Sequence, residues 1–377
     1  MRHKTGPGRI DLLCLSHLRW DFVFQRPQHL LTRALDSMRV LFWEEPVWTE
    51  EEQPRLDTIV SSEGVIVLRP YIPHGFDEAL TLRGLLDGML LEQRVSDPIV
   101  WYYTPCAIVF SDHVARRMTV YDCMDELSAF AGADPTLPAQ ERALMRRADV
   151  VFTGGHSLYE AKAQHHSRVH AFPSGVETEH FGPARSGLPD PLDQAGIPYP
   201  RAGFYGVIDE RLDTGLLGAV ADLRPGIQFV LIGPTAKLDE ADLPRRPNIH
   251  YLGIRIYSEL PAYVANWQVA LMPFAITAAT RYISPTKTPE YLAAGLPVVS
   301  TPITDVIRQY GRLPGVAIAH DPATFAAAID RALRLDPADW WPGADAVLAG
   351  KSWDATWARM LSLLTPPATP NVAEAAD

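Results

Sequence analysis

The sequence predicts an α/β protein built from two doubly wound, Rossmann-like domains that face each other across a cleft. Short apolar runs rich in β-branched and aromatic residues alternate with longer helical patterns along the whole chain. Most runs are continuously apolar, which is typical of parallel strands covered by helices on both faces. One stretch dense in Pro and Gly divides this pattern in two, and 377 residues are long for a single hydrophobic core.

Each apolar run is expected to be a strand, and the segments between the runs return the chain to the start of the next one. In the first half the strands are expected at 10–16, 39–45, 65–70, 99–103, 118–123, 149–154 and 168–172. In the second half they are expected at 202–207, 227–233, 248–253, 268–273, 296–300 and 315–319. Ligands of such sheets bind at the carboxyl ends of the strands, so we expect the active site between the two domains.

The domain boundaries follow from composition. Residues 182–201 are dense in Pro and Gly, which indicates a linker between an N-terminal domain over 1–181 and a C-terminal domain over 202–365. Near the end of the second domain, helical spacing places Trp353, Trp357 and Leu361 on one face. Residues 366–377 are rich in Pro and Ala, and we expect a disordered tail there.

Bulk properties exclude several classes of protein. The net charge of −11 argues against binding of nucleic acid through its phosphates. Cys14, Cys106 and Cys123 show neither metal-ligand spacing nor an even disulfide framework, which favours buried thiols in a reducing compartment. The start of the chain does not resemble a secretory signal, and no apolar run approaches the roughly 18 residues of a transmembrane helix. We therefore expect a cytoplasmic protein, with peripheral association at the inner face of the cell membrane left open.

The most informative segment of the second domain is residues 284–300, SPTKTPEYLAAGLPVVS. Thr286 or Thr288 can cap a helix there, which places free N–H groups and the positive end of the helix dipole at the cleft. Lys287 stands beside this helix start, and Ser284 precedes it. Together these groups form a candidate diphosphate site. The alternative is an ordinary capped helix with a solvated lysine.

A glycine loop opens the second domain. The strand at 202–207 ends near Gly206, which permits a close backbone approach, and Arg211 in the charged turn that follows could reach a phosphate. The loop lacks both the Walker pattern and the Gly-x-Gly-x-x-Gly pattern. A surface pair between Arg211 and Asp213 is the alternative.

These segments resemble the donor half of GT-B glycosyltransferases, above all the broad family 4 of bacterial enzymes. The resemblance is carried by GFYGVIDERLD, FVLIGP, NIHYLG, LPAYVANWQVALMPF and TPEYLAAGLPVVST, in that order. In the first half, FPSGVETEHF (172–181) resembles the signature that ends the family's acceptor domain. The segment SHLRWDFVFQRPQHLL (16–31) resembles cell-envelope glycosyltransferases of the teichuronic-acid-like type.

The resemblance implies a GT-B fold and transfer of a sugar from a UDP- or GDP-linked donor to a glycan, lipid-linked or other hydroxyl acceptor. It implies no cofactor besides this donor substrate and no bound metal. Glu290 matches the second glutamate of the family's Glu-seven-residues-Glu motif, which holds the donor ribose, and Lys287 and Arg211 fall where the family places diphosphate cations. Tyr282 occupies the position of the first glutamate, which contacts the transferred hexose.

The first domain offers two candidate catalytic side chains. His17 follows the first strand, where it could contact the sugar or accept a proton, and a histidine that caps the next turn is the alternative. Asp125 follows the strand that ends near Asp122 and could orient an acceptor hydroxyl, or it could cap the next helix. Asp122, Asp125 and Glu126 lack Asp-x-Asp spacing, and the histidines form no ligand pair, so no metal site is predicted.

The segment 16–31 leaves the role of its polar residues open. Arg26 and Gln28, on either side of Pro27, hold either the local backbone or the acceptor. The aromatic residues in this segment, Trp20, Phe22 and Phe24, could stack on a sugar, although alternating aromatics more often pack in a core.

Two other hypotheses compete with the transferase. A nucleotide-sugar epimerase of the same fold would use the same donor site without an acceptor. A catalytically silent, nucleotide-binding subunit of a polysaccharide assembly complex would bind the nucleotide without turnover, and Tyr282 in place of the first glutamate keeps this hypothesis open. The transferase is favoured because polar residues suited to the cleft occur in both domains.

Overall fold

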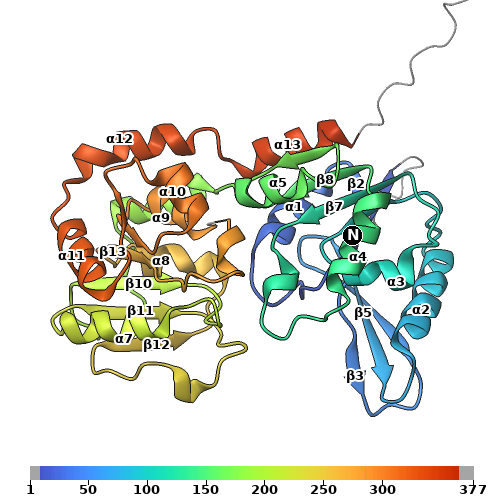
Figure 1. The fold of residues 1–377 in the computed structure, drawn as a ribbon, viewed down its shortest axis with the longest axis horizontal. Helices are drawn as coiled ribbons and strands as arrows, with labels where there is room; N and C mark the ends of the chain where they lie inside the picture. The colour runs from blue at the N-terminus through green and yellow to red at the C-terminus, as the bar shows by residue number, and fades with distance from the viewer. Residues whose placement is uncertain (1–8, 285, 365–377) are drawn as a thin grey trace, which may run out of the picture.

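A computed structural model describes residues 9–284 and 286–364 and contains two sheets, each flanked by helices (Figure 1). The first sheet has the strand order β3-β5-β2-β1-β6-β7-β8-β9, with β4 added on β5. The second has the order β12-β11-β10-β13-β14-β15. All strand pairs are parallel except β4 with β5. The prediction of two doubly wound α/β halves is confirmed.

The first half combines short, almost fully buried central strands with helices on both faces of the sheet. Its strands are β1 (Ile10–Leu15), β2 (Met38–Trp43), β3 (Val47–Thr49), β4 (Arg55–Val60), β5 (Ile66–Pro73), β6 (Ile99–Tyr102), β7 (Met118–Cys123), β8 (Val150–Thr153) and β9 (Val169–Ala171). Its helices are α1 (Arg26–Ala34), α2 (Glu78–Glu92), α3 (Ile108–Ser111), α4 (Leu137–Arg147) and α5 (His156–Lys162).

The second half repeats this plan. Its strands are β10 (Arg201–Tyr205), β11 (Gln228–Ile232), β12 (Ile249–Gly253), β13 (Val269–Met272), β14 (Val298–Ser300) and β15 (Val316–Ile318). The helices from the crossover onward are α6 (Thr178–Phe181), α7 (Thr214–Leu223), α8 (Leu260–Val264), α9 (Lys287–Ala293), α10 (Thr304–Tyr310), α11 (Pro322–Ala332), α12 (Pro337–Leu348) and α13 (Trp353–Leu363). Three 3₁₀ turns, η4 (Glu240–Asp242), η5 (Tyr257–Glu259) and η6 (Thr280–Tyr282), lie in loops of the described part of this half.

Strands β3 and β4 were not predicted. They occupy an acidic stretch in which β4 is partly exposed along its whole length. Because β4 pairs on one side only, antiparallel to β5, it has no need of the continuous apolar run by which the buried strands were recognised.

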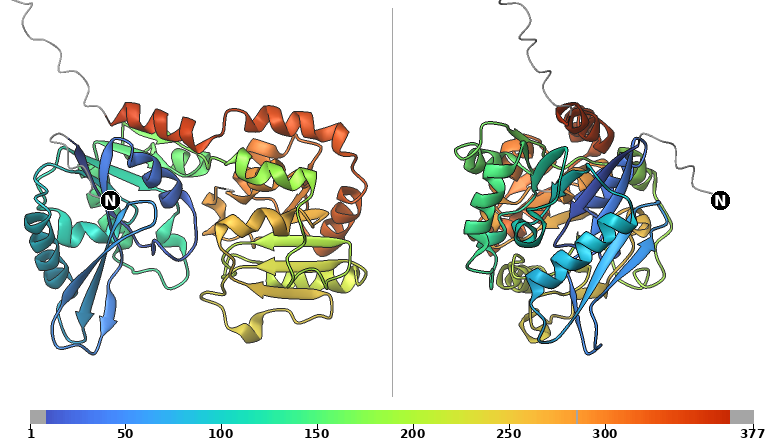
Figure 2. Two further views of the ribbon diagram at one scale, coloured as in Figure 1. Left: turned by 180° about the vertical axis from the view of Figure 1, so that it is seen from behind. Right: turned by 90° about the vertical axis from the view of Figure 1, so that its right-hand side faces the viewer.

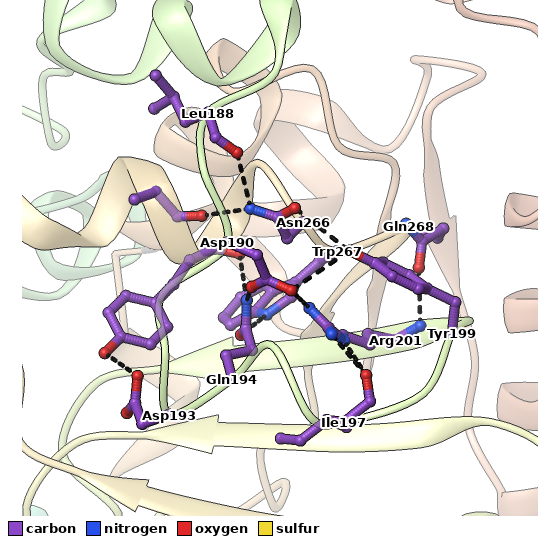
Figure 3. Close-up of polar contacts among 12 residues, drawn as sticks. Leu188, Asp190, Asp193, Gln194, Ile197, Tyr199, Arg201, Asn266, Trp267 and Gln268 are labelled. Atoms are coloured by element: carbon purple, nitrogen blue, oxygen red, sulfur yellow. Dashed lines mark hydrogen bonds and ion pairs between the residues drawn. The ribbon is translucent and has the colours of Figure 1, made fainter.

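The Pro- and Gly-rich segment expected to be a linker is fixed to the second half by polar contacts (Figure 3). Arg201 is fully buried, and its guanidinium donates to Asp190 at 2.7 Å and to the Ile197 carbonyl at 2.9 Å. The Gln194 side chain accepts from the Trp267 indole at 2.8 Å. These contacts orient the start of β10, and therefore the loop that follows it.

The last helix, α13, lies against the first half although it follows the second half in sequence (Figure 2). Trp353, Trp357 and Met360 are buried in the first half's core, and the ring centroids of Trp357 and Trp101 are 6.1 Å apart. The chain thus crosses between the halves twice, once before α6 and once before α13. The predicted tail at 366–377 lies outside the described residues.

None of the helices within 9–284 and 286–364 combines the length and apolarity needed to cross a bilayer. Cys14, Cys106 and Cys123 are free thiols, of which Cys14 and Cys123 are buried.

Candidate active site

The loop after β10 is covered by the lysine at the start of α9. Gly206 has a φ of +139°, which favours glycine, and an added methyl group there would overlap the Lys287 Cε and lie 2.8 Å from its Nζ. Lys287 is half-buried, and this burial lowers its pKa while the nearby Glu290 carboxylate raises it. Two residues predicted as donor contacts from separate segments therefore meet in space.

Arg211 is held beside this pair by a carboxylate that the sequence analysis missed. Its Nε donates to both oxygens of Asp209, at 2.9 and 3.0 Å. The alternative pairing with Asp213 does not form, because Asp213 caps α7 by accepting from the Leu216 amide at 2.8 Å. Asp209 precedes Arg211 by two residues in a conspicuously charged turn, and that spacing could have indicated the pair.

Glu290 lies in the first turn of α9 and is 7% exposed. The hydroxyl of Tyr205, the last residue of β10, donates to Glu290 Oε2 at 2.5 Å. Burial raises the pKa of Glu290 to about 7, and the bond from Tyr205 and the Lys287 charge oppose this rise. A buried carboxylate with spare acceptor capacity is suited to accepting hydroxyl donors from a ligand.

The predicted helix start at Thr286 is confirmed, but Thr286 forms no side-chain cap hydrogen bond. The hydroxyls of Ser284 and Thr288 are buried and have no partner among the described residues. Ser284 lies near Gly155 of the first half, since a methyl group on Gly155 would be 3.2 Å from the Ser284 Cβ. The start of α9 thus carries polar groups that the described chain leaves unsatisfied.

Asp125 of the first half faces the cations of the second. Burial raises the pKa of Asp125, the positive charges of Arg211 and Lys287 lower it, and the Asp209 carboxylate raises it. In the described part of the chain no cap geometry involves its carboxylate, and the residue that precedes the next 3₁₀ turn is Glu126. The charges of the predicted donor cations therefore act on Asp125 across the boundary between the halves.

Phe130, in the same loop as Asp125, contacts the second half directly. The Arg211 guanidinium carbon lies 5.5 Å from its ring centroid, and the Lys237 ammonium lies 5.4 Å from it. Both are cation–π arrangements, and they join the loop after β7 to the loops after β10 and β11.

His17 of the first half is influenced by a lysine of the second half, Lys237. Burial lowers its pKa to about 4, a hydrogen bond to the Tyr103 backbone raises it, and the Lys237 charge lowers it. Its Nδ1 is buried and has no partner among residues 9–284 and 286–364. His17 is therefore neutral at pH 7 and keeps one ring nitrogen available to a ligand.

The segment around Arg26 is a closed structural network. Arg26 is 2% exposed, its guanidinium donates to Asp122 at 2.9 to 3.1 Å, and it also donates to the Phe172 carbonyl at 2.8 Å. The Gln28 amide donates to the Trp20 carbonyl at 2.7 Å. Arg26 and Gln28 thus hold the local backbone, and Asp122 is occupied by Arg26. No cluster of three His, Cys, Asp or Glu side chains able to hold a metal occurs in the described ranges.

Tyr282 borders a cavity of about 420 Å³ between α5 and η6. The cavity is lined by residues of the first half, such as Ser157 and Gln164, and by residues of the second half, such as Tyr282 itself. Beside it, fully buried Asp305 accepts from the Ser157 amide at 3.2 Å and from its hydroxyl at 2.8 Å. No sequence pattern pointed to Asp305, because its partner belongs to the other half.

Comparisons with known proteins point to one family and one fold. Residues 201–334 match the family Glycosyl transferases group 1. The chain is 26% identical over 251 residues to the teichuronic acid biosynthesis glycosyltransferase TuaH of Bacillus subtilis, covering 62% of this chain and 63% of that relative. The chain therefore spans less than two thirds of that relative's length.

Several solved structures share the fold. Sucrose-phosphate synthase from Thermosynechococcus elongatus is 17% identical with a TM-score of 0.73, covering 94% of this chain and 98% of that one. The UDP-forming trehalose-phosphate synthase from Burkholderia xenovorans is 14% identical with a TM-score of 0.68, covering 96% and 100%. A trehalose-6-phosphate structure from E. coli, bound with UDP-2-fluoro glucose, is 15% identical with a TM-score of 0.69, covering 95% and 99%.

Proposed function

We propose that the protein transfers a sugar from a nucleoside diphosphate sugar to a hydroxyl acceptor, because residues 201–334 match the group 1 glycosyltransferases and the chain has the GT-B fold. UDP and GDP are the nucleotides proposed for the donor. The acceptor is proposed to be a glycan or lipid-linked glycan of the cell envelope, in line with the name of the relative TuaH.

The observation that carries the proposal is the meeting of Gly206, Arg211, Lys287 and Glu290 at the carboxyl end of β10. Two cations beside an open glycine loop suit a diphosphate, since charge-assisted hydrogen bonds are about twice as strong as neutral ones. A buried carboxylate one helical turn from Lys287 suits the ribose hydroxyls. The cations would also stabilise the negative charge of the departing diphosphate.

Asp125 is proposed to act from the acceptor side, as the group that orients or deprotonates the attacking hydroxyl. Its pKa is raised by burial, which makes the carboxylate a better proton acceptor than a solvated aspartate. His17 is proposed as a polar contact to the sugar or acceptor, because its unpartnered Nδ1 is buried at the same interface.

Catalysis is proposed to need no metal ion, because Arg211 and Lys287 supply the charge that Mg²⁺ supplies in metal-dependent transferases. Asp122, in β7 just before the loop that includes Asp125, is paired with Arg26. Turnover should therefore persist in EDTA. Complete loss in EDTA with recovery on adding Mn²⁺ would contradict this part of the proposal.

The direct test is a thermal-shift screen with UDP, GDP, ADP and dTDP. A nucleotide present at about 100 times its Kd should stabilise the native protein by about 2.7 kcal/mol. The corresponding nucleotide sugar is then incubated with and without acceptor. Transfer only with acceptor supports the transferase, conversion of the donor alone supports an epimerase, and binding without any turnover supports a silent subunit. No stabilisation by any of the four nucleotides would overturn the proposal.

A further inference from the structure

Tyr257 carries a buried hydroxyl that the chain does not use. It starts η5, in the loop after β12. Its hydroxyl oxygen is buried and forms no hydrogen bond within the described part of the chain. Burying a hydroxyl without a partner costs free energy, so each such group in a folded protein needs an explanation.

The ring of Tyr257 is held rigidly by residues from both sides of the interface. It stacks on Phe24 of the first half, with centroids 4.6 Å apart and planes 19° apart, and on His180 of the crossover, with centroids 4.3 Å and planes 14° apart. The His180 ring nitrogen also lies 3.1 Å from the Tyr257 carbonyl. The unused hydroxyl is therefore not the loose end of a mobile side chain, because its position is fixed by two stacked rings.

The hydroxyl lies close to the carboxylate assigned to the donor ribose. Phe181 packs against Tyr257, with ring centroids 5.7 Å apart, and against Tyr205, with centroids 6.3 Å apart, and Tyr205 donates to Glu290. Burial raises the pKa of Tyr257, and the charges of the Glu290 and Glu177 carboxylates raise it further. Glu177 is already paired with Arg33 at 3.1 Å. Glu290 accepts from Tyr205 through one oxygen, Oε2. Around Phe181, the described residues thus present a hydroxyl without a partner and a carboxylate with remaining acceptor capacity.

We propose that the Tyr257 hydroxyl contacts a ribose hydroxyl of the donor nucleoside, beside Glu290. A ribose offers two adjacent hydroxyls, one of which can donate to Glu290 while the other exchanges a hydrogen bond with Tyr257. This inference rests on the proposed function. It adds a donor contact that is anchored, through Phe24, to the half of the protein that holds the acceptor.

The test combines a side-chain change with a ligand change. Tyr257→Phe removes only the hydroxyl and keeps the stacked ring. Affinities are measured by calorimetry for UDP or GDP, whichever binds wild type, and for its 2′,3′-dideoxy analogue. Tyr257→Phe should weaken binding of the ribonucleotide about five- to tenfold, the effect of one hydrogen bond. It should leave binding of the dideoxy analogue within about twofold of wild type, because the partner hydroxyl is then absent from both complexes.

Tyr251→Phe is the matched control, since its hydroxyl donates to the Pro244 carbonyl at 3.1 Å and has no place in the donor site. It should change neither affinity. Equal binding of the ribonucleotide by wild type and Tyr257→Phe would overturn the inference while leaving the proposed function intact. Equal losses for both ligands would show that Tyr257 acts through packing, and would overturn it too. Failure of wild type to bind any nucleoside diphosphate would instead remove the proposed function itself.

Discussion

Two clusters of buried charged residues lie near the boundary between the halves, and they differ in whether each charge is matched by a partner. Around Arg26, every strong charge is matched: the guanidinium is 2% exposed, Asp122 is fully buried, and the two are joined at 2.9 Å. Around Lys287 the balance is incomplete, because burial lowers the pKa of the lysine and raises those of Glu290 and Asp125.

The difference separates framework from site. A buried ion pair whose geometry satisfies both partners fixes the fold locally. Buried ionisable groups whose pKa values are shifted toward the neutral form mark a place where a ligand is expected, since shifted pKa values concentrate at functional sites. By this criterion the region after β10 and at the start of α9, together with Asp125, is the proposed active site, and the Arg26 network belongs to the framework.

The distinction between framework and site would fail if the charge of Asp125 could be removed without loss of turnover. Asp125→Asn keeps the size of the side chain and removes its charge and its capacity to accept a proton. Turnover should fall about 10²- to 10⁴-fold, the usual effect of removing a general base. Nucleotide Kd and Tm should stay within error of wild type, as measured by calorimetry and thermal melting. Wild-type turnover would remove Asp125 from the active site.

Because Arg26 belongs to the framework, its replacement should lower the free energy of unfolding and leave nucleotide binding unchanged. Arg26→Met keeps much of the side-chain volume but leaves Asp122 charged and unpaired in the core. Unfolding should become easier by about 3–5 kcal/mol, measured by denaturant titration. At denaturant concentrations at which the variant is still folded, its Kd for the nucleotide should be the same as that of wild type. A variant with normal stability and no turnover would move Arg26 from the framework into the site.

The ionisation of Glu290 should make the stability of the protein depend on pH. Its pKa is about 7 in the folded protein against an ordinary value of 4.5, so the folded state binds the extra proton between these values. The contribution of Glu290 to wild-type stability should therefore be complete below pH 4.5 and be lost, by about 3 kcal/mol, as pH rises through 7, at about 1.4 kcal/mol per pKa unit. Glu290→Gln should abolish this fall.

The same Glu290→Gln variant should bind nucleotide less tightly, because an amide is a weaker acceptor for the ribose hydroxyls than a carboxylate. Denaturant titrations at pH 5 and pH 8 and a calorimetric Kd supply the measurements. A variant no more stable than wild type at pH 8 would show that burial of the charged Glu290 carboxylate does not destabilise the folded protein.

The sequence allowed much of the fold to be predicted, because the central strands of both sheets are short, continuously apolar runs. It failed at β3 and β4, whose half-exposed residues carry no such run. It also could not show that Trp353 and Trp357 of α13 would pack against the first half, since an apolar helix face indicates burial but not the surface that buries it.

In the site, Gly206, Lys287 and Glu290 lie on two segments whose local patterns and family resemblance were both visible. Asp209 and Tyr205 gained their roles from tertiary contacts with Arg211 and Glu290. Asp125 and His17 were predicted as catalytic, and the structure places both at the interface without testing their chemistry. These assignments therefore stay predictions.

The most direct measurement is the affinity of wild type, Lys287→Ala and Arg211→Ala for the nucleoside diphosphate that stabilises the protein. Each variant should bind about 10- to 100-fold more weakly, because a hydrogen bond to a charged group contributes about 1.5–3 kcal/mol.

Arg246→Ala is the matched control, since its guanidinium also donates to both oxygens of an aspartate, Asp222, but on an exposed surface. It should bind as wild type does. Weaker binding by both Lys287→Ala and Arg211→Ala with an unaffected control is the result this account predicts. Normal binding by both would contradict it and place the donor elsewhere.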